Sequence, residues 1–432
     1  MYRTVMEKLL EWKANSRRKP LVLRGARQVG KTWLMNEFAK IAYEDSIYIS
    51  FDNDSTSGKI FEETKNPMTI LERLTLIRGK KIIPGKTLII LDEIQECPNA
   101  LGSLKYFNEN ANEYHVIAAG SLLGTYLSEP ASYPVGKVNL LNIYPLTFEE
   151  YLAADDEGMY QYYYGVKTGR DYISAFHSRM IEHYKKYLII GGMPECVQSW
   201  VSNTNPEEID IIQNEIISLY ENDFTKYSSK VNSGRILQIF RSIVPQLAKD
   251  NGEKFMYSAI AKSARARDYE DAIEWLVSSG IVYRIMNITK PEYPLRAYEK
   301  FNHFKLFLLD TGLIKQLAKL SNKSILQYDA FSFKGSLVEN YVLGQLLPVL
   351  NYTPSFYTFA QGREIDFLLQ CEDNIIPVEV KAGENKKAIS FKGYIEKYKP
   401  DIAIRFNINE YMINGAITNI PLYLTGKFRY LI

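Results

Sequence analysis

The chain has 432 residues, 46% of them hydrophobic and 24% charged, with 52 Lys and Arg residues against 50 Asp and Glu. This hydrophobic content excludes a mainly disordered chain, because burial of so many apolar side chains can offset the entropy lost on folding. The net charge of +2 excludes a uniformly basic protein that coats nucleic acid. Because domains commonly contain about 100–200 residues, the length predicts two to four domains.

Cysteine and histidine are too scarce for several classes of site. The three cysteines, Cys97, Cys196 and Cys371, lie far apart, which argues against a disulfide framework or a cysteine-based zinc site and indicates a reducing compartment. With four histidines, the chain is not expected to build a histidine-rich metal centre. The N-terminal segment mixes charges of both signs with apolar residues, unlike a secretory signal. No apolar run reaches the roughly 18–20 residues of a membrane span, so we expect a cytoplasmic protein.

The strongest motif follows an amphipathic helix over residues 6–14 and a short strand in PLVLRG. Residues 25–32 read GARQVGKT, which is the G-x-x-x-x-G-K-T pattern of a P-loop, and the segment TWLMNEFAKIA continues as a helix. Glycines permit the tight turn through which backbone N–H groups and the helix N-terminus surround phosphates. Lys31 would reach the β- and γ-phosphates and Thr32 would bind Mg²⁺. A chance glycine-rich turn rarely lies between a strand and a helix in this way.

A carboxylate pair ends a second apolar strand. In KTLIILDEIQ, residues 88–91 form an uninterrupted apolar run that is typical of a parallel strand covered on both faces, and Asp92 and Glu93 follow it. We expect Asp92 to hold Mg²⁺ through its water shell and Glu93 to polarise the attacking water. An acidic strand end is common alone, but it is unusual about sixty residues after a P-loop.

Further strands are predicted in SIYISFD, YHVIAAGS and VNLLNIYPLTF. Ser121, at the end of the second of these, could contact the γ-phosphate, although a plain turn explains this residue almost as well. Strands that alternate with helices predict a doubly wound parallel sheet with right-handed crossovers.

The segments GARQVGKT, LDEIQECPNALGSLK, VIAAGS and VGKVNLLNIYPLTFEEYL resemble prokaryotic AAA-type ATPases that carry a restriction-endonuclease-like C-terminal domain. The resemblance implies ATP and Mg²⁺ as cofactors. The preference for adenine rests on it, since the chain has no guanine-reading N-K-x-D motif. The family usually has a Gly-Arg pair where this chain has Gly136-Lys137, and lysine lacks the bidentate fork of arginine. The expected nucleotide-binding residues are Gly25, Ala26, Arg27, Gln28, Val29, Gly30, Lys31, Thr32, Trp33 and Ser121.

The middle of the chain is predicted to be mainly helical. Residues 154–228 form a helical linker or lid, interrupted by a turn at Gly191-Gly192-Met193-Pro194 that resembles a family signature. That turn is either a brace over the nucleotide or a simple packed turn. Residues 229–300 are predicted to form three helices followed by strands, the order of a winged helix. Its third helix carries Asp268, Glu270, Asp271 and Glu274, and these acids would repel DNA phosphates, so we interpret the module as a packing element.

The C-terminal region, residues 301–432, contains a second candidate site. A helix with Glu339 precedes a predicted hairpin, whose strands EIDFLLQ and NIIPVEVKAG hold Asp366, Glu379 and Lys381. Glu379 and Lys381 are two residues apart and share one strand face. This D…E-x-K pattern is that of restriction-endonuclease-like domains. The three acids would bind Mg²⁺, and Lys381 would orient or deprotonate the attacking water. The alternative is a solvated strand face with alternating charges.

These predictions lead to a four-part chain, with an AAA-type P-loop core over residues 1–153 before the three regions above. The leading hypothesis is a Mg²⁺-dependent ATPase whose nucleotide state controls the nuclease-like domain, which would contact nucleic acid. The alternative is an ATP-operated switch or scaffold that acts on a protein partner, or through self-association, with an inactive nuclease-like domain. A DNA-binding regulator is a third possibility, against which the acidic helix argues.

Overall fold

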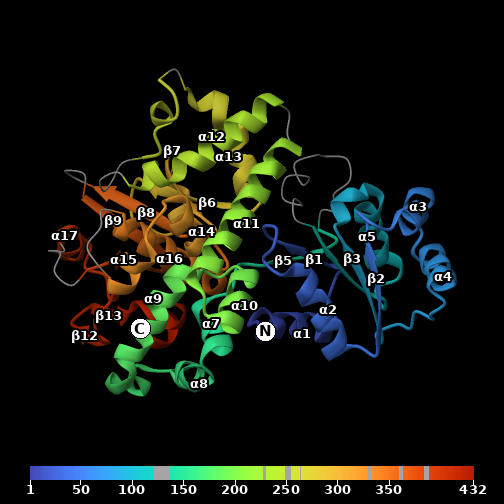
Figure 1. The fold of residues 1–432 in the computed structure, drawn as a ribbon, viewed down its shortest axis with the longest axis horizontal. Coiled ribbons are helices and arrows are strands. Elements are labelled where there is room, and N and C mark those ends of the chain that lie inside the picture. Colours follow the sequence, from blue (N-terminus) through green and yellow to red (C-terminus); the bar gives the residue numbers. More distant parts are fainter. Residues whose placement is uncertain are drawn as a thin grey trace. The chain divides into compact units, whose positions relative to one another are not determined.

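The computed structural model describes residues 1–120, 136–226, 230–248, 254–262, 264–328, 333–359, 363–383 and 389–432 (Figure 1). The chain divides into two compact units. The N-terminal unit comprises Arg3–Tyr144 and Ser278–Ile281, and the C-terminal unit comprises Met1–Tyr2, Pro145–Val277 and Val282–Ile432. Predicted residue Ser121 lies outside the described residues.

The N-terminal unit contains a five-stranded parallel sheet in the order β2-β3-β4-β1-β5. Its strands are β1 (Leu21–Arg24), β2 (Asp45–Ser50), β3 (Thr87–Asp92), β4 (His115–Ala119) and β5 (Asn139–Asn142). Its helices are α1 (Val5–Ala14), α2 (Lys31–Ala42), α3 (Ser55–Glu63), α4 (Pro67–Arg78) and α5 (Pro98–Asn110). These elements match the strands and the first two helices expected from the sequence.

Helices cover both faces of this sheet. Side chains of β3 alternate, and Ile89 and Leu91 pack in one apolar cluster with Leu101 and Leu104 of α5. Helix α2 contacts β2, β3 and β4, and Figure 1 shows α2 on the side of the sheet opposite α5. Because both faces are covered, β3 and β4 are buried along their whole length. The parallel α/β sheet expected from the sequence is confirmed.

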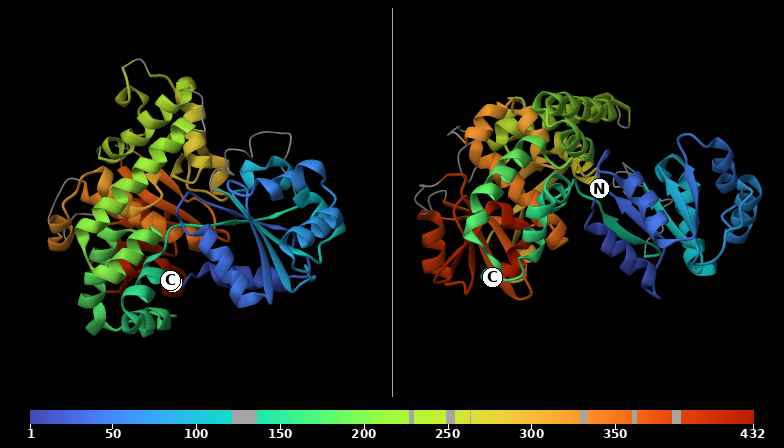
Figure 2. Two further views of the ribbon diagram at one scale, coloured as in Figure 1. Left: turned by 45° about the vertical axis from the view of Figure 1, so that its right-hand side comes forward. Right: turned by 60° about the horizontal axis from the view of Figure 1, so that its bottom comes forward.

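The C-terminal unit is built on an eight-stranded mixed sheet in the order β12-β13-β11-β10-β9-β8-β6-β7. Its strands are β6 (Val282–Ile288), β7 (Glu299–Leu308), β8 (Ser355–Phe359), β9 (Arg363–Cys371), β10 (Asn374–Val380), β11 (Ala403–Asn407), β12 (Met412–Asn414) and β13 (Ile417–Pro421). Strands β9 and β10 pair antiparallel, so the predicted hairpin is confirmed, whereas β10, β11 and β13 are parallel. Figure 2 shows these strands in orange and red. A restriction-endonuclease-like fold stays a prediction.

The described part of this unit also contains α-helices. They are α7 (Phe148–Asp155), α8 (Glu157–Gly165), α9 (His177–Ile190), α10 (Pro194–Asn203), α11 (Pro206–Lys226), α12 (Lys230–Leu247), α13 (Ala266–Ser278), α14 (Thr311–Leu317), α15 (Asn322–Gln327), α16 (Lys334–Leu350), α17 (Ile389–Tyr398) and α18 (Phe428–Leu431). No helix of the described residues is long and apolar enough to cross a membrane.

The turn between α9 and α10 is a packed turn within this unit. Gly192 N donates to Asp310 Oδ2 at 2.6 Å, and Leu146 N donates to the carbonyl of Gly192 at 2.6 Å. Gly191 has φ +72°, and a Cβ there would lie 2.3 Å from Asp310 Oδ1. Burial raises the pKa of Asp310 to about 6, although four backbone N–H groups, that of Gly192 foremost, favour its charged form. These contacts are those of the packed-turn alternative.

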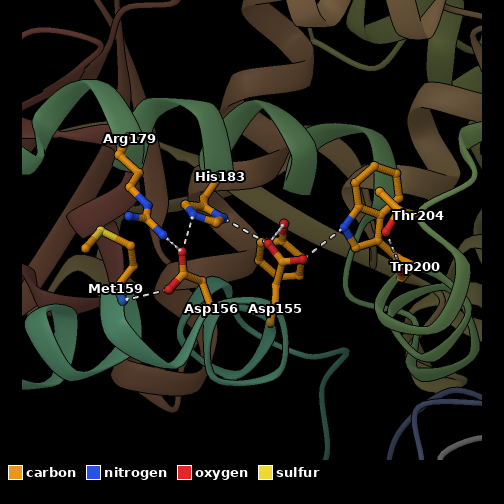
Figure 3. Close-up of polar contacts among 8 residues, drawn as sticks. Asp155, Asp156, Met159, Arg179, His183, Trp200 and Thr204 are labelled. Atoms are coloured by element: carbon orange, nitrogen blue, oxygen red, sulfur yellow. Dashed lines mark hydrogen bonds and ion pairs between the residues drawn. The ribbon is translucent and has the colours of Figure 1, made fainter.

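Charged side chains join α7, α8 and α9 in the C-terminal unit (Figure 3). His183 is buried, and its Nδ1 lies 2.9 Å from Asp155 Oδ2 while its Nε2 lies 3.2 Å from Asp156 Oδ2. Trp200 Nε1 donates to Asp155 Oδ1 at 3.1 Å, and Arg179 pairs with Asp156 at 2.5 Å. Because contacts occur on both ring nitrogens, the imidazole is clamped between the two carboxylates.

The segment expected to form a winged helix differs from that pattern in one helix. Over residues 257–262 the structure has only a 3-10 turn, Tyr257–Ala259, because so short and mostly unburied a segment lacks the packing that stabilises a helix. Two of the four acids of α13 have an internal partner, since Arg284 of β6 pairs with Glu270 at 2.7 Å and also with Glu274. This pairing supports the interpretation of α13 as a packing element, and a winged helix stays a prediction.

Candidate functional site: a P-loop beside two carboxylates

The loop between β1 and α2 has a backbone that depends on glycine. Gly25 has φ +152°, and a Cβ there would lie 2.3 Å from the carbonyl oxygen of Ile143. Gly30 precedes α2 with φ 89° and gives the helix no side-chain cap. The first N–H groups of α2 therefore receive no bond from a capping side chain and can face an anion. Gln28 also has a positive φ of 63°, so the loop holds a non-glycine residue in the left-handed region.

Arg3 supports this loop from the N-terminal end of the unit. Its guanidinium is buried and donates from Nη1 to the carbonyl of Val29 at 3.0 Å and from Nη2 to that of Tyr144 at 2.8 Å. The two bonds tie the P-loop to the chain just after β5. The sequence offers no signal for this contact, because the partners are 26 and 141 residues away.

Lys31 folds back over the loop. Its Nζ donates to the carbonyls of Gly25 at 2.9 Å and Ala26 at 2.7 Å. Burial lowers the pKa of Lys31 to about 8, while the charges of Glu93 and Asp92 act in the opposite direction. The two carboxylates thus only partly offset the cost of burying the ammonium, and an anion bound at the loop would stabilise its charged form.

Asp92 is joined to the P-loop although β4 lies between β3 and β1, the strand that precedes this loop, in the sheet order. Thr32 Oγ1 donates to Asp92 Oδ2 at 2.7 Å, and Glu93 N donates to Oδ1 at 3.1 Å. Burial raises the pKa of Asp92, and the hydroxyl bonds from Thr32 and Tyr48 partly oppose that rise. Parallel strands bring their carboxyl ends to one sheet edge, which explains how residues sixty positions apart meet.

Tyr48 is a member of the site that the sequence analysis missed. It lies on β2, which pairs with β3, and its hydroxyl donates to Asp92 Oδ2 at 2.9 Å. Burial, together with the negative charge of Asp92, raises the pKa of Tyr48 to about 12. The sequence places Tyr48 on a predicted strand, but it does not show that this strand lies beside the strand of Asp92, so the contact could not be predicted.

Glu93 is held in an unusual backbone conformation. Its φ and ψ are 50° and 44°, in the left-handed region, which for a non-glycine residue costs about 1–3 kcal/mol and is frequent at functional sites. Gln95 Nε2 donates to Glu93 Oε2 at 2.5 Å. Gln95 is buried and orients the predicted residue Glu93. It is the second residue of this site that was not predicted from the sequence.

The other predicted nucleotide residues line the same segment. Ala26 and Val29 are buried, whereas Arg27 is half-buried and its charge adds to the lowering of the pKa of Lys31. Trp33, in the first turn of α2, is 40% exposed. The exposed indole is accessible to a ligand. A role of Trp33 in nucleotide binding stays a prediction.

Lys137, at the position where the resembling family has arginine, pairs with Glu109 of α5 at 2.8 Å. Both side chains are partly exposed, so this ion pair is weak.

The C-terminal candidate site has a different character. Glu379 is buried and pairs with Lys381 at 2.9 Å and with Arg405 at 2.8 Å. Asp366 Oδ2 accepts a bond from Val380 N at 2.6 Å. Burial raises the pKa of Asp366, and the negative charges of Glu339 and then Glu364 raise it further.

Among the described residues, no group of three or more His, Cys, Asp or Glu side chains could hold a metal ion. The predicted metal set of Glu339, Asp366 and Glu379 lies entirely within the described residues. Two basic side chains, Lys381 and Arg405, already engage Glu379, and a Mg²⁺ site in this set stays a prediction. Lys381 lies beside Glu379 as the E-x-K spacing requires.

The family comparisons agree with the P-loop geometry. Residues 17–152 match the family model of an AAA domain. Residues 181–324 and 334–424 match two domains of unknown function, DUF8612 and DUF4143. An AAA-type P-loop ATPase domain is supported by the first match. The two others specify no activity.

Relatives of the whole chain are remote. The uncharacterized protein MJ1637 of Methanocaldococcus jannaschii is 24% identical over 278 residues, which cover 61% of this chain and 55% of that protein. This chain thus spans about half the length of this curated relative. Similar solved structures include the Aeropyrum pernix ORC1 protein in complex with DNA (14% identity, TM-score 0.29, 73% of this chain and 90% of that chain). The Thermotoga maritima RuvB Holliday junction branch migration motor has 14% identity and a TM-score of 0.29, over 66% and 90% of the two chains.

Proposed function

We propose that the N-terminal unit binds ATP with Mg²⁺ and hydrolyses it. The observation that carries the proposal is the bond of 2.7 Å between Thr32 Oγ1 and Asp92 Oδ2, which joins the P-loop to the acidic strand end. Lys31 lies over the loop, and Glu93 follows Asp92 directly. At one sheet edge these residues would supply a phosphate-binding loop, oxygen ligands for Mg²⁺ and a carboxylate for the attacking water.

The residues present fit a magnesium ion. Hydroxyl and carboxylate oxygens are ligands that Mg²⁺ prefers, and Thr32 and Asp92 would hold the ion, Asp92 through its water shell. When bound, Mg²⁺ supplies positive charge that balances the phosphate oxygens. Lys31 would exchange its carbonyl partners for phosphate oxygens, and Glu93, held by Gln95, would orient the attacking water.

Phosphate release from ATP tests hydrolysis. We expect activity in the wild type and none above background in Lys31→Ala, because the loop would lose its mobile positive charge. Lys40→Ala is the matched control, since Lys40 lies on the same helix with a side chain that is 75% exposed. A wild type no more active than Lys31→Ala would contradict hydrolysis, and calorimetric titration with ATP would then show whether the chain binds without hydrolysing.

For the C-terminal domain, the ion pairs of Glu379 favour the hypothesis of an ATP-operated switch or scaffold. A carboxylate already paired with Lys381 and Arg405 has little free capacity for a metal ion. In this function the nucleotide state of the N-terminal unit would be transmitted to a protein partner or a second copy of the chain. Nuclease action would be absent.

The competing hypothesis, an ATPase that controls a nuclease, makes an opposite prediction. Purified chain would cut DNA or RNA with Mg²⁺ or Mn²⁺, in a manner that depends on ATP, and cutting would disappear in Asp366→Ala and Lys381→Ala. The assay is run with and without ATP. Cutting by the wild type that both variants abolish would overturn the switch hypothesis, whereas cutting that survives in both variants points to a contaminant.

A further inference from the structure

Lys305 of β7 is a largely but not fully buried cation in the C-terminal unit that no sequence motif indicates. Its side chain is 14% exposed and forms an ion pair with Glu364 Oε1 of β9, whose side chain is 2% exposed. The ammonium also lies 5.1 Å from the centre of the Phe356 ring on β8. Lys305 thus reaches from the edge strand of the sheet across an aromatic ring to a carboxylate on another strand.

Two more carboxylates lie in the field of this ammonium. Burial by itself would lower the pKa of Lys305, but the charges of Glu364, Glu339 and Asp366 outweigh it and raise the pKa. Burial raises the pKa of Glu339, and Lys305 is the first group that opposes this rise. The acids come from α16 and β9, and Lys305 interacts electrostatically with all three, with a direct ion pair to Glu364.

The wider cluster comes close to neutrality. Its four carboxylates belong to Glu339, Glu364, Asp366 and Glu379, and three basic side chains face them. Lys381 and Arg405 engage Glu379, while Lys305 engages Glu364. With four carboxylates and three basic side chains the ionised set carries a net charge of only −1, so a divalent cation would gain little net attraction from it.

We propose that Lys305 is the built-in counter-ion of this cluster, and that its ammonium takes the role that a divalent cation would have among Glu339, Glu364 and Asp366. The C-terminal domain then binds neither Mg²⁺ nor Mn²⁺ in these carboxylates and does not cleave nucleic acid through them. This inference extends the switch hypothesis, and it does not depend on ATP hydrolysis, which belongs to the other unit.

The test is Mn²⁺ binding to the nucleotide-free full chain. Binding is measured as the decrease in the electron paramagnetic resonance signal of free Mn²⁺. We expect weak binding in the wild type and in Lys305→Arg, which keeps the charge. Lys305→Met should bind about one equivalent at least about tenfold more tightly, because the acids lose their cation. Addition of Glu339→Gln to Lys305→Met should abolish the gain, and it also corrects for Mn²⁺ bound elsewhere.

Two outcomes would overturn the proposal. One is a wild type that binds Mn²⁺ tightly and loses it in Asp366→Asn, which would make the cluster a metal site. The other is a folded Lys305→Met that gains no Mn²⁺. If Lys305→Met does not fold, the double variant Lys305→Met/Glu364→Gln removes the unpaired acid together with its partner. That variant should fold and bind Mn²⁺ more tightly than Glu364→Gln alone; equal binding would count against Lys305.

Discussion

The two acidic sites of this chain differ in what surrounds their carboxylates. In the N-terminal unit, neutral hydroxyl and N–H groups donate to Asp92, so its negative charge remains available to a cation. In the C-terminal unit, ammonium and guanidinium groups pair with Glu364 and Glu379, so those charges are already balanced. We therefore expect an acidic motif to bind a metal ion only where the fold leaves its negative charge uncompensated.

The largest expected effect belongs to Glu93. Glu93→Gln should retain ATP binding but lower the rate of phosphate release on the order of 10³-fold, because the neutral amide cannot polarise the attacking water. Single-turnover kinetics and calorimetric titration with ATP separate the two steps. An unchanged rate would remove Glu93 from the mechanism and erase the functional contrast between the sites.

The next effect concerns the stability of the C-terminal unit. Lys305→Ala should lower the free energy of unfolding by about 3 kcal/mol, because Glu364 would remain buried without its partner. Lys381→Ala is the matched control and should cost less than about 1 kcal/mol, since Arg405 still pairs with Glu379 and Lys381 is partly exposed. Urea unfolding measures the free energy of unfolding of both variants. Equal decreases would contradict the claim that, among the described residues, Lys305 is the sole partner that balances Glu364.

Gly25→Ala tests the backbone of the P-loop. The substitution should destabilise the N-terminal unit by about 1–3 kcal/mol and weaken ATP binding, because its Cβ would meet the carbonyl of Ile143. Gly58→Ala is the control, because a Cβ at this helical position has nothing within 4 Å. It should leave binding unchanged and stabilise the unit slightly. Equal effects of the two changes would refute the close approach.

The lowered pKa of Lys31 predicts a pH dependence of binding. Above pH about 8 the free chain loses the ammonium proton, and bound phosphates favour its return, so ATP binding should take up a proton there. Affinity should fall by up to about tenfold per pH unit above this value. Calorimetry in two buffers of different ionisation enthalpy measures the proton uptake. Binding without uptake at pH 9 would show that Lys31 keeps its charge.

The smallest effect belongs to Tyr48. Tyr48→Phe removes one hydroxyl bond that lowers the pKa of Asp92, so the acidic limb of the ATPase pH profile should move upward by about one unit or less. The Mg²⁺ concentration for half-maximal rate should also increase. Tyr106→Phe on α5 serves as control. A pH profile that stays in place would limit Tyr48 to packing.

The sequence by itself determined the local elements of both sites. The P-loop, its flanking strand and helix, the acidic end of β3 and the β9–β10 hairpin follow from glycine positions, apolar runs and turn residues, which act within a few residues. The second of the three helices expected within residues 229–300 is replaced by a 3-10 turn at Tyr257–Ala259, because a short segment depends on packing that its own residues do not specify. The functions expected of the site residues, those of Ser121 and Trp33 included, stay predictions.

Only the tertiary structure decided which side chains share a site. Tyr48, Gln95 and Arg3 join the nucleotide site, and Lys305 joins the C-terminal acids, through contacts that depend on strand order and on distant segments. The sequence shows where carboxylates stand but not which charges face them, because Coulomb interactions depend on distance in space. Asp92 accepts hydrogen bonds from hydroxyl groups, whereas Glu364 forms an ion pair with an ammonium group. That difference separates the site proposed for Mg²⁺ from the cluster proposed to exclude it.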